Sequence, residues 1–325
     1  MANISINYMG LKLKSPVIAA SSGLTSKIDK IEELEKAGVG AVVLKSLFEE
    51  QIVNNAEYLD SLSTDFPESA NYIHYYVREN SIENHLTLLK EAKKRVSIPV
   101  IASINCYSPG EWLDYAREVA AAGADALELN IYSMPLNIRE NSADIEQGYL
   151  KIVGEVTKSI SIPVAVKISS DFTNLPGFTD KLKGYGAKGV VMFNKFYMPD
   201  IDIEKLEISS ADPFSSKESY LKELRWIGII SALVPGIDIS ASTGIYNAEI
   251  AVKEILAGAA AVQVCSALYK NGTKAIDEIN SGIASFMEQK GFGSVADFRG
   301  KLNYSNISDP GKFERVQFMK SFGSK

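Results

Sequence analysis

Cysteine and histidine are both scarce in this chain of 325 residues, which contains two of each. Cys106 and Cys265 are too far apart for a Cys-x-x-Cys motif, and two thiols make no disulfide framework. His74 and His85 form neither a His-x-His nor a His-Glu-x-x-His spacing. We therefore expect a reduced, cytoplasmic setting, no bound metal ion, and no iron–sulfur cluster held by this chain.

Long apolar runs and an excess of positive charge are missing as well. Every apolar run is shorter than about 10 residues, whereas a membrane-spanning helix needs about 20. Residues 1–14 lack the apolar stretch of a signal peptide. The chain has 34 basic and 40 acidic residues, a net charge of −6 that offers no general attraction to phosphate backbones. We expect a small-molecule substrate, with neither nucleic acid nor a membrane as partner.

The chain does contain a repeated unit, in which a short apolar run is followed by a stretch with helical spacing. The eight apolar runs lie at 16–21, 41–46, 99–105, 126–132, 163–169, 189–194, 238–243 and 261–267. The helical stretches lie at 26–38, 82–96, 110–123, 146–160, 178–186, 219–231, 247–258 and 273–290. Such continuous apolar runs are typical of parallel strands buried on both faces. Eight units predict a (β/α)8 TIM barrel rather than a doubly wound sheet.

Glycines at the helix ends and the lengths of the loops between the units support this prediction. Four helical stretches end at glycines suited to a left-handed C-cap, namely Gly38, Gly123, Gly186 and Gly258. Long loops are expected at 48–80 and 195–217, after the second and sixth strands, at the end of the barrel where enzymes of this fold build their sites. We expect one domain over 1–325, with a polar tail from about residue 291.

Polar residues stand at the C-terminal ends of the predicted strands. Lys45, Asn130 and Lys167 interrupt apolar runs, which is costly unless each is paired or bound to a ligand, although a lysine at a strand end can also reach solvent. Small residues at 242–244 and 265–266 allow backbone amides to approach a phosphate near a helix N-terminus, or serve as ordinary helix caps.

Several segments occur together in the order found in one enzyme family. They read SPVIAASSGL, AVVLKSL, ADALELNIYS, PVAVKIS, GVVMFN, GAAAVQVCSALYKNG and FMEQKGFGSVADFRGKL. From about Leu11 to Leu302 the chain resembles the class 1 dihydroorotate dehydrogenases. It is most similar to a group of dihydroorotate dehydrogenase-like proteins that carry LKSLFEEQI, NKFYMPDIDIE and LRWIGII.

The resemblance implies an FMN-binding homodimer that oxidises dihydroorotate to orotate in pyrimidine biosynthesis, with hydride passing to flavin N5. Lys45 corresponds to the lysine between flavin and substrate, and Lys167 to the lysine at the N1 edge of the flavin. The positions that correspond to FMN contacts are Ser22, Gly23, Lys45, Ser46, Ser103, Asn130, Lys167, Phe193, Thr243, Gly244, Cys265 and Ser266. The substrate positions are Lys45, Asn130 and Asn194.

Two departures from the family pattern leave the substrate and electron acceptor open. Ser133 stands where class 1 enzymes carry a cysteine base, and a serine hydroxyl needs activation to act as a base. It is our candidate for the catalytic base, beside Lys45, although it can also be a plain loop residue. The family's NSMGLPN stretch is replaced by FPESANYIHYYVREN at 66–80. The aromatic and polar residues there either line the binding site of a different substrate or pack the loop onto the barrel.

Three alternatives remain at this point. The chain can be an FMN oxidoreductase for a different small substrate, or a flavin-binding relative without catalytic activity. It can also be a barrel enzyme in which Lys45 or Lys167 forms a Schiff base. Visible flavin colour in the purified protein separates the first two from the third.

Overall fold

In the computed structural model, residues 2–48, 68–106, 112–132, 134–196 and 198–314 are described, with backbone alone for 68–80, 106 and 112. Parallel strands form the centre, and β4 pairs with β3 on one side and β6 on the other, which closes the sheet into a cylinder. Its strands are β3 (Val17–Ala19), β4 (Ala41–Val43), β6 (Val100–Cys106), β7 (Ala126–Ile131), β8 (Val164–Ile168), β9 (Gly189–Met192), β12 (Asp238–Ser242) and β13 (Ala261–Val264). Within the described residues the predicted eight-stranded barrel is confirmed.

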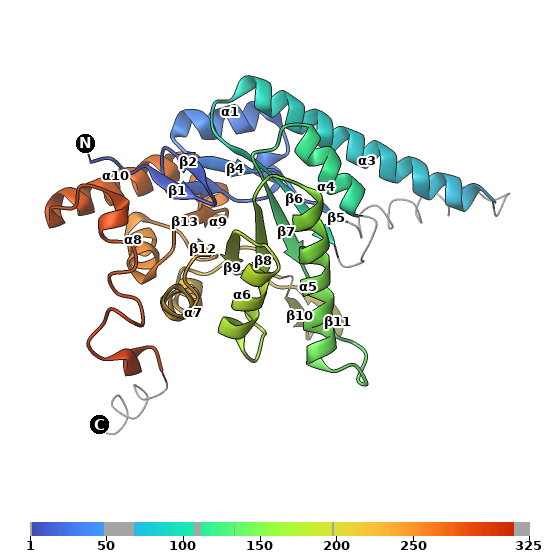
Figure 1. Cartoon of the computed structure of the whole chain (residues 1–325). Coiled ribbons are helices and arrows are strands. Elements are labelled where there is room, and N and C mark those ends of the chain that lie inside the picture. The colour runs from blue at the N-terminus through green and yellow to red at the C-terminus, as the bar shows by residue number, and fades with distance from the viewer. Residues whose placement is uncertain (1, 49–67, 107–111, 133, 197, 315–325) are drawn as a thin grey trace.

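Helices surround this cylinder, as Figure 1 shows. They are α1 (Ile28–Ala37), α3 (Glu68–Arg95), α4 (Trp112–Ala121), α5 (Ser142–Ser159), α6 (Leu175–Gly184), α7 (Tyr220–Leu233), α8 (Ala248–Ala257), α9 (Ser266–Asn271) and α10 (Lys274–Lys290). The expected glycines follow four of the helical units with positive φ, for example 100° at Gly38 and 94° at Gly123. None of the helices in the described ranges is both long and apolar enough to cross a membrane.

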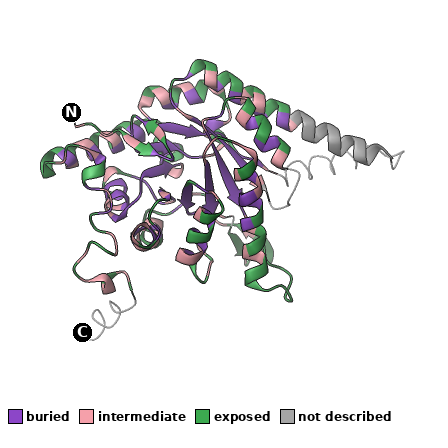
Figure 2. Cartoon of the chain, viewed as in Figure 1, coloured by how far each residue is buried: buried purple, intermediate pink, exposed green. Residues whose placement is uncertain are grey.

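The apolar core has two layers. The outer layer lies between strands and helices, and it gives the purple centre of Figure 2, where exposed residues face outward from the helices. The inner layer fills the lower half of the cylinder with Ile18, Val43, Ile101 and Val191 among small alanines. Each large apolar side chain buried in this way stabilises the fold by about 1.5–3 kcal/mol.

An antiparallel hairpin that we did not predict closes the N-terminal end of the cylinder. It consists of β1 (Ile6–Tyr8) and β2 (Leu11–Leu13), joined by a turn in which Met9 and Gly10 have φ of 53° and 84°. Tyr8 is 1% exposed and packs with the inner layer. The Met9 amide donates to the Asp238 carboxylate at the start of β12, over 2.7 Å.

Both predicted long loops contain regular structure, which corrects the sequence analysis. Helix α3 begins at Glu68 rather than near residue 82, and it projects away from the barrel in Figure 1. No glycine or proline interrupts 68–95, so nothing stops the helix from extending back into the loop. After β9, the hairpin of β10 (Pro199–Asp202) and β11 (Glu207–Ser210) occupies part of the second loop.

The strand 2 unit is interrupted. Residues 44–46 leave the sheet after β4, and the chain returns as β5 (Leu47–Phe48), which pairs with the upper part of β6. The interruption sits at the mouth of the barrel.

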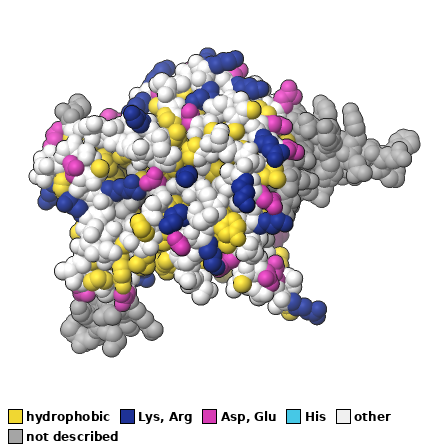
Figure 3. Space-filling model, in the orientation of Figure 1, with side chains coloured by type: hydrophobic (Ala, Val, Ile, Leu, Met, Phe, Trp, Pro, Cys, Tyr) yellow, Lys and Arg dark blue, Asp and Glu magenta, His cyan; other side chains and the backbone are white. Residues whose placement is uncertain are grey.

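On the face seen in Figure 3, basic side chains are scattered among acidic ones, so this face carries no extended basic surface.

Candidate active site

A cavity of about 170 Å³ lies at the C-terminal ends of the strands. Several residues that the sequence analysis selected line it, contributed by β8 and by the segments that directly follow β9, β12 and β13. These residues are Lys167, Asn194, Thr243, Gly244, Cys265 and Ser266. The structure therefore brings one lysine and the small-residue turns together at one rim, as the barrel prediction requires.

A buried charged group forms the floor of this cavity. Lys167 Nζ lies 3.8 Å from Glu128 Oε1, and the two side chains are 10% and 2% exposed. Glu128 Oε2 accepts a hydrogen bond from Gln263 Nε2 at 2.7 Å. Since β7, β8 and β13 each contribute one of these residues, a polar layer sits directly above the apolar interior.

Two asparagines link neighbouring strand ends beside Lys167. The Asn194 Nδ2 group donates to Asn130 Oδ1 over 2.8 Å. Asn130 pairs in register with Lys167 across β7 and β8, so both side chains stand at the same height in the barrel. The predicted substrate residues Asn130 and Asn194 thus adjoin the lysine, with their amides fixed by each other.

A chain of hydroxyl groups connects the ends of three further strands. Ser46 Oγ lies 2.9 Å from Ser21 Oγ and 2.7 Å from Ser103 Oγ, and the Ser46 amide donates to Ser21 Oγ at 2.8 Å. Ser103 is fully buried, and its hydroxyl contacts the turn after β4 through Ser46. Lys45, on the same turn, is exposed and does not line the cavity.

The backbone of Lys45 is held from the helix side by a pair that we did not predict. His85 Nε2 lies 3.1 Å from the Lys45 carbonyl oxygen, and His85 Nδ1 lies 2.5 Å from the Tyr115 hydroxyl. Because a carbonyl oxygen only accepts, Nε2 carries the proton and Tyr115 donates to Nδ1. Burial lowers the pKa of His85 to about 4, in keeping with a neutral ring. The only signal in the sequence was a lone histidine on the inner face of a helix.

The turn after β12 meets two serines. Thr243 and Gly244 have φ of 90° and 76°, and the Gly244 amide donates to Ser215 Oγ at 3.1 Å. The amide and hydroxyl of Ser215 both donate to Ser266 Oγ at 3.1 Å. Ser215 is not among the residues selected from the sequence, yet it is buried at the centre of this cluster.

The other predicted contacts lie around this cluster. Thr243 Oγ1 donates to the Phe193 carbonyl at 3.0 Å, whereas the Phe193 side chain packs in the outer core, so only its backbone faces the site. Burial raises the pKa of the Cys265 thiol, against smaller opposing effects of Lys167 and of a hydrogen bond with Ser22. Gly23 follows Ser22 at the same rim and is exposed.

Some candidates fall outside the described part of the chain. Ser133 is among them, so its place relative to Asn130 is not described. Asn71, Tyr72, His74, Tyr75 and Tyr76 belong to the backbone of α3, but their side chains are also outside it.

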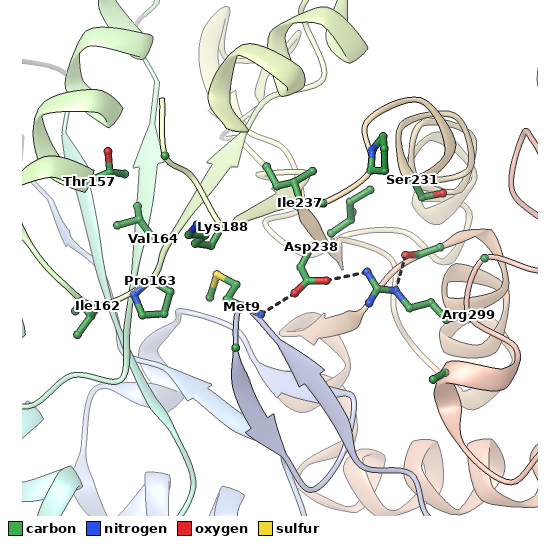
Figure 4. Close-up of a pocket in the computed structure, with 18 of the residues that line it drawn as sticks. Met9, Thr157, Ile162, Pro163, Val164, Lys188, Ser231, Ile237, Asp238 and Arg299 are labelled. Carbon is green, nitrogen blue, oxygen red and sulfur yellow. Dashed lines mark hydrogen bonds and ion pairs between the residues drawn. The ribbon is translucent and has the colours of Figure 1, made fainter. Parts of the chain in front are cut away.

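A larger hollow of about 860 Å³ lies at the opposite end of the barrel, shown in Figure 4. Its charged groups already pair with each other. Arg299 Nη2 donates to Asp238 at 2.9 Å and Arg299 Nε donates to the Gly258 carbonyl at 3.1 Å, while Lys188 is exposed. Sites in barrel enzymes lie at the C-terminal ends of strands, so the smaller cavity at the mouth is the better candidate despite its size.

The described residues contain no group of three or more His, Cys, Asp or Glu side chains placed to hold a metal ion. The mouth instead offers one ammonium group at its floor, and amide and hydroxyl groups at its rim. These are groups that bind an anionic or strongly polar organic ligand.

Comparison with known proteins points to one family. A family model described as dihydroorotate dehydrogenase matches residues 3–287. A protein of Methanosarcina acetivorans named dihydroorotate dehydrogenase B (NAD(+)), catalytic subunit, is 28% identical over 90% of this chain and 94% of its own length. A Thermoplasma acidophilum protein of the same name is 29% identical over 92% and 99%. The Escherichia coli NAD-dependent dihydropyrimidine dehydrogenase subunit PreA is 24% identical over 93% and 77%.

Proposed function

Because this chain belongs to the dihydroorotate dehydrogenase family, we propose that it is an FMN-dependent oxidoreductase acting on a CH–CH bond of a small cyclic substrate. The observation that carries the proposal is the buried Lys167 ammonium at the floor of the mouth cavity, with the amide and hydroxyl cluster of Gly244, Ser215 and Ser266 lining the same space. Such a site suits a ligand with a polar ring edge and a phosphate.

The residues present fit FMN. A side chain at position 244 is disfavoured, since a Cβ there would lie 2.6 Å from the Tyr220 amide nitrogen, and the Gly244 amide donates to Ser215 Oγ within the serine cluster. Thr243, Gly244, Cys265 and Ser266 would hold the phosphate together with Ser215, and Ser22 and Gly23 would lie against the ring. The remaining proposed contacts are Lys45, Ser46, Ser103, Asn130, Lys167 and the Phe193 backbone. FMN supplies the hydride acceptor when bound.

We propose dihydroorotate as the substrate, with oxidation to orotate in pyrimidine biosynthesis. Lys45 would bind the substrate carboxylate, and Asn130 and Asn194 would orient the ring by hydrogen bonding. The His85 contact supports this role, since it holds the backbone of Lys45 while the ammonium stays exposed. Ser133 would accept the C5 proton, for which its hydroxyl needs a neighbouring proton acceptor.

The test is anaerobic mixing of the FMN-loaded protein with L-dihydroorotate, with dihydrouracil as the comparison substrate. Bleaching of the visible flavin band by dihydroorotate, abolished in Ser133→Ala, supports the full proposal. Bleaching by dihydrouracil alone would support the proposed oxidoreductase activity, with dihydrouracil in place of dihydroorotate as the substrate. If neither compound reduces the flavin, the chain binds FMN but does not catalyse this reaction. If the protein does not bind FMN, the proposal is overturned.

A Schiff-base lysine is not favoured by the same geometry. That chemistry needs a neutral amine. In the structure the Lys167 ammonium is instead ion-paired with the buried Glu128 carboxylate, 3.8 Å away.

We also propose that residues 1–325 form one cytoplasmic FMN-binding domain that assembles as a homodimer. The exposed apolar side chains of the β10–β11 hairpin support an interface, since Ile201 and Ile208 pair across the strands and are 62% and 71% exposed. Light scattering after size exclusion tests this. The double variant Ile201→Asp/Ile208→Asp should be monomeric. A monomeric wild-type chain would contradict the proposed homodimer.

A further inference from the structure

We propose that Glu128 and Gln263 are positioning residues that hold the Lys167 ammonium group in place at the floor of the mouth cavity, directed at the polar ring edge of the bound cofactor. This inference rests on the proposed function for the identity of the ligand. Its claim about Lys167, however, concerns side chains of the described chain alone and is testable without a ligand.

The geometry makes Glu128 the partner of Lys167. The carboxylate of Glu128 is 2% exposed and lies 3.8 Å from Lys167 Nζ. Glu128 pairs in register with Ala165 and Asn130 with Lys167, so Glu128 stands one inward-facing layer below the lysine. The carboxylate is therefore placed to anchor the lysine from beneath, on the side away from the cavity.

Gln263 fixes the carboxylate in turn. Its amide donates to Glu128 Oε2 over 2.7 Å, while Gln263 itself lines the cavity. Glu128 Oε1 and Gln263 Oε1 have no hydrogen-bond partner within the described ranges, although both atoms are buried. Buried acceptors of this kind indicate a donor still to be bound, which in this site is the lysine ammonium or an N–H group of a ligand.

Within the described residues the surroundings of the pair are mostly apolar. The inner layer of the core contains Ile101, Ala165 and Val191, and Tyr8 closes it from the base. Burial raises the pKa of Tyr8 well above its usual value, and the charges of Glu128 and Asp238 raise it further. Glu128 is thus the carboxylate that pairs with Lys167 among the described residues.

The ligand-free test measures how fast Lys167 is acylated by acetic anhydride at neutral pH, by mass spectrometry of the apoprotein. The ion pair with Glu128 holds the Lys167 side chain at the cavity floor, so Glu128→Gln should free it to meet the reagent and raise its acylation rate about tenfold relative to other lysines. Glu254→Gln is the matched control, since it makes the same substitution at an equally buried carboxyl on α8. An unchanged Lys167 rate in Glu128→Gln overturns the proposal, whatever the chain binds.

The ligand-bound test measures sulfite affinity of the FMN-loaded protein, which rises when a cation lies next to the flavin ring. Glu128→Gln should weaken sulfite binding about tenfold, and should have no further effect in a Lys167→Met background. Stronger sulfite binding in Glu128→Gln would mean that the carboxylate acts only as a negative charge, and overturns the proposal. Equal losses of sulfite affinity on Glu128→Gln in the wild-type and Lys167→Met backgrounds would also overturn the proposal.

Gln263→Leu serves as a second variant should Glu128→Gln fold poorly. It frees the carboxylate without removing its charge, so both readouts should shift in the same direction by a smaller factor. Absence of FMN binding in the wild-type chain, together with faster Lys167 acylation in Glu128→Gln, would refute the proposed function and leave the positioning role intact.

Discussion

Gly244 shows how a single residue determines the shape of the mouth. Its φ of 76° disfavours any side chain, and a Cβ would meet the Tyr220 amide nitrogen at 2.6 Å. We therefore expect Gly244→Ala to lower the free energy of unfolding by more than about 1 kcal/mol, measured by urea denaturation. Gly148→Ala is the control, since Gly148 lies in α5 with open space around it, and there alanine should stabilise by up to about 1 kcal/mol.

The pair of His85 and Tyr115 makes a second prediction at the residue scale. Tyr115→Phe removes the hydrogen bond to His85 Nδ1, and His85→Leu removes that bond and the one to the Lys45 carbonyl; each should cost about 1–3 kcal/mol of unfolding free energy. The double variant should cost less than the sum of the two, because it removes both partners. Additive losses in urea denaturation would show that the two side chains act independently.

The position of a residue at the barrel mouth was predictable where one strand end carries its own signal, but contacts between residues of different elements were not. Lys167 and Gly244 were selected because a lysine and a glycine stand out at strand ends. The importance of Ser215 could not be foreseen, because its partners Gly244 and Ser266 follow it by 29 and 51 positions. The same holds for Tyr115, whose contact with His85 depends on how two helices pack.

At the scale of elements, the contact between α7 and α8 buries two carboxyl groups. Burial raises the pKa of Glu223 to about 7, and burial followed by the charge of Glu223 raises that of Glu254 well above its usual value. Since the folded chain holds these protons more tightly than the unfolded chain, the stabilisation is complete below about pH 4.5. It is lost as pH rises through about 7.

We expect the wild-type chain to lose about 3 kcal/mol of unfolding free energy between pH 4.5 and pH 8 from Glu223 alone. Glu223→Gln should remove that part of the decline, as urea titrations at several pH values would reveal. Glu118→Gln, at an exposed position of α4, should keep the wild-type slope. A Glu223→Gln slope equal to that of the wild-type chain would contradict the assignment.

Elements with a strong apolar period were predicted well, because burial on both faces of a strand or on one face of a helix leaves its period in the sequence. The start of α3 was missed because its first turns lie in a polar and aromatic segment without that period. The β10–β11 hairpin was missed because its isoleucines face outward, and Ile201 opposite Ile208 adds no core signal.

At the scale of the whole molecule, the Tyr8 side chain fills the base of the cylinder. The inner layer around it contains Ala41, Ala126, Ala165 and Ala261, whose small side chains leave room for the ring. Tyr8→Ala should lower the free energy of unfolding by about 3–5 kcal/mol, a value typical of a deleted buried aromatic ring. Lys12→Ala, on the exposed face of the same hairpin, should change it by less than about 0.5 kcal/mol.

The N-terminal hairpin also decides how the protein can be handled. Since β1 and β2 cover the base, the first residues emerge at the end of the cylinder remote from Lys167 and the turn at Gly244. A tether or solid support attached there would leave the opposite opening facing the solution. Surface-immobilised enzyme should then exchange small solutes as freely as the protein in solution.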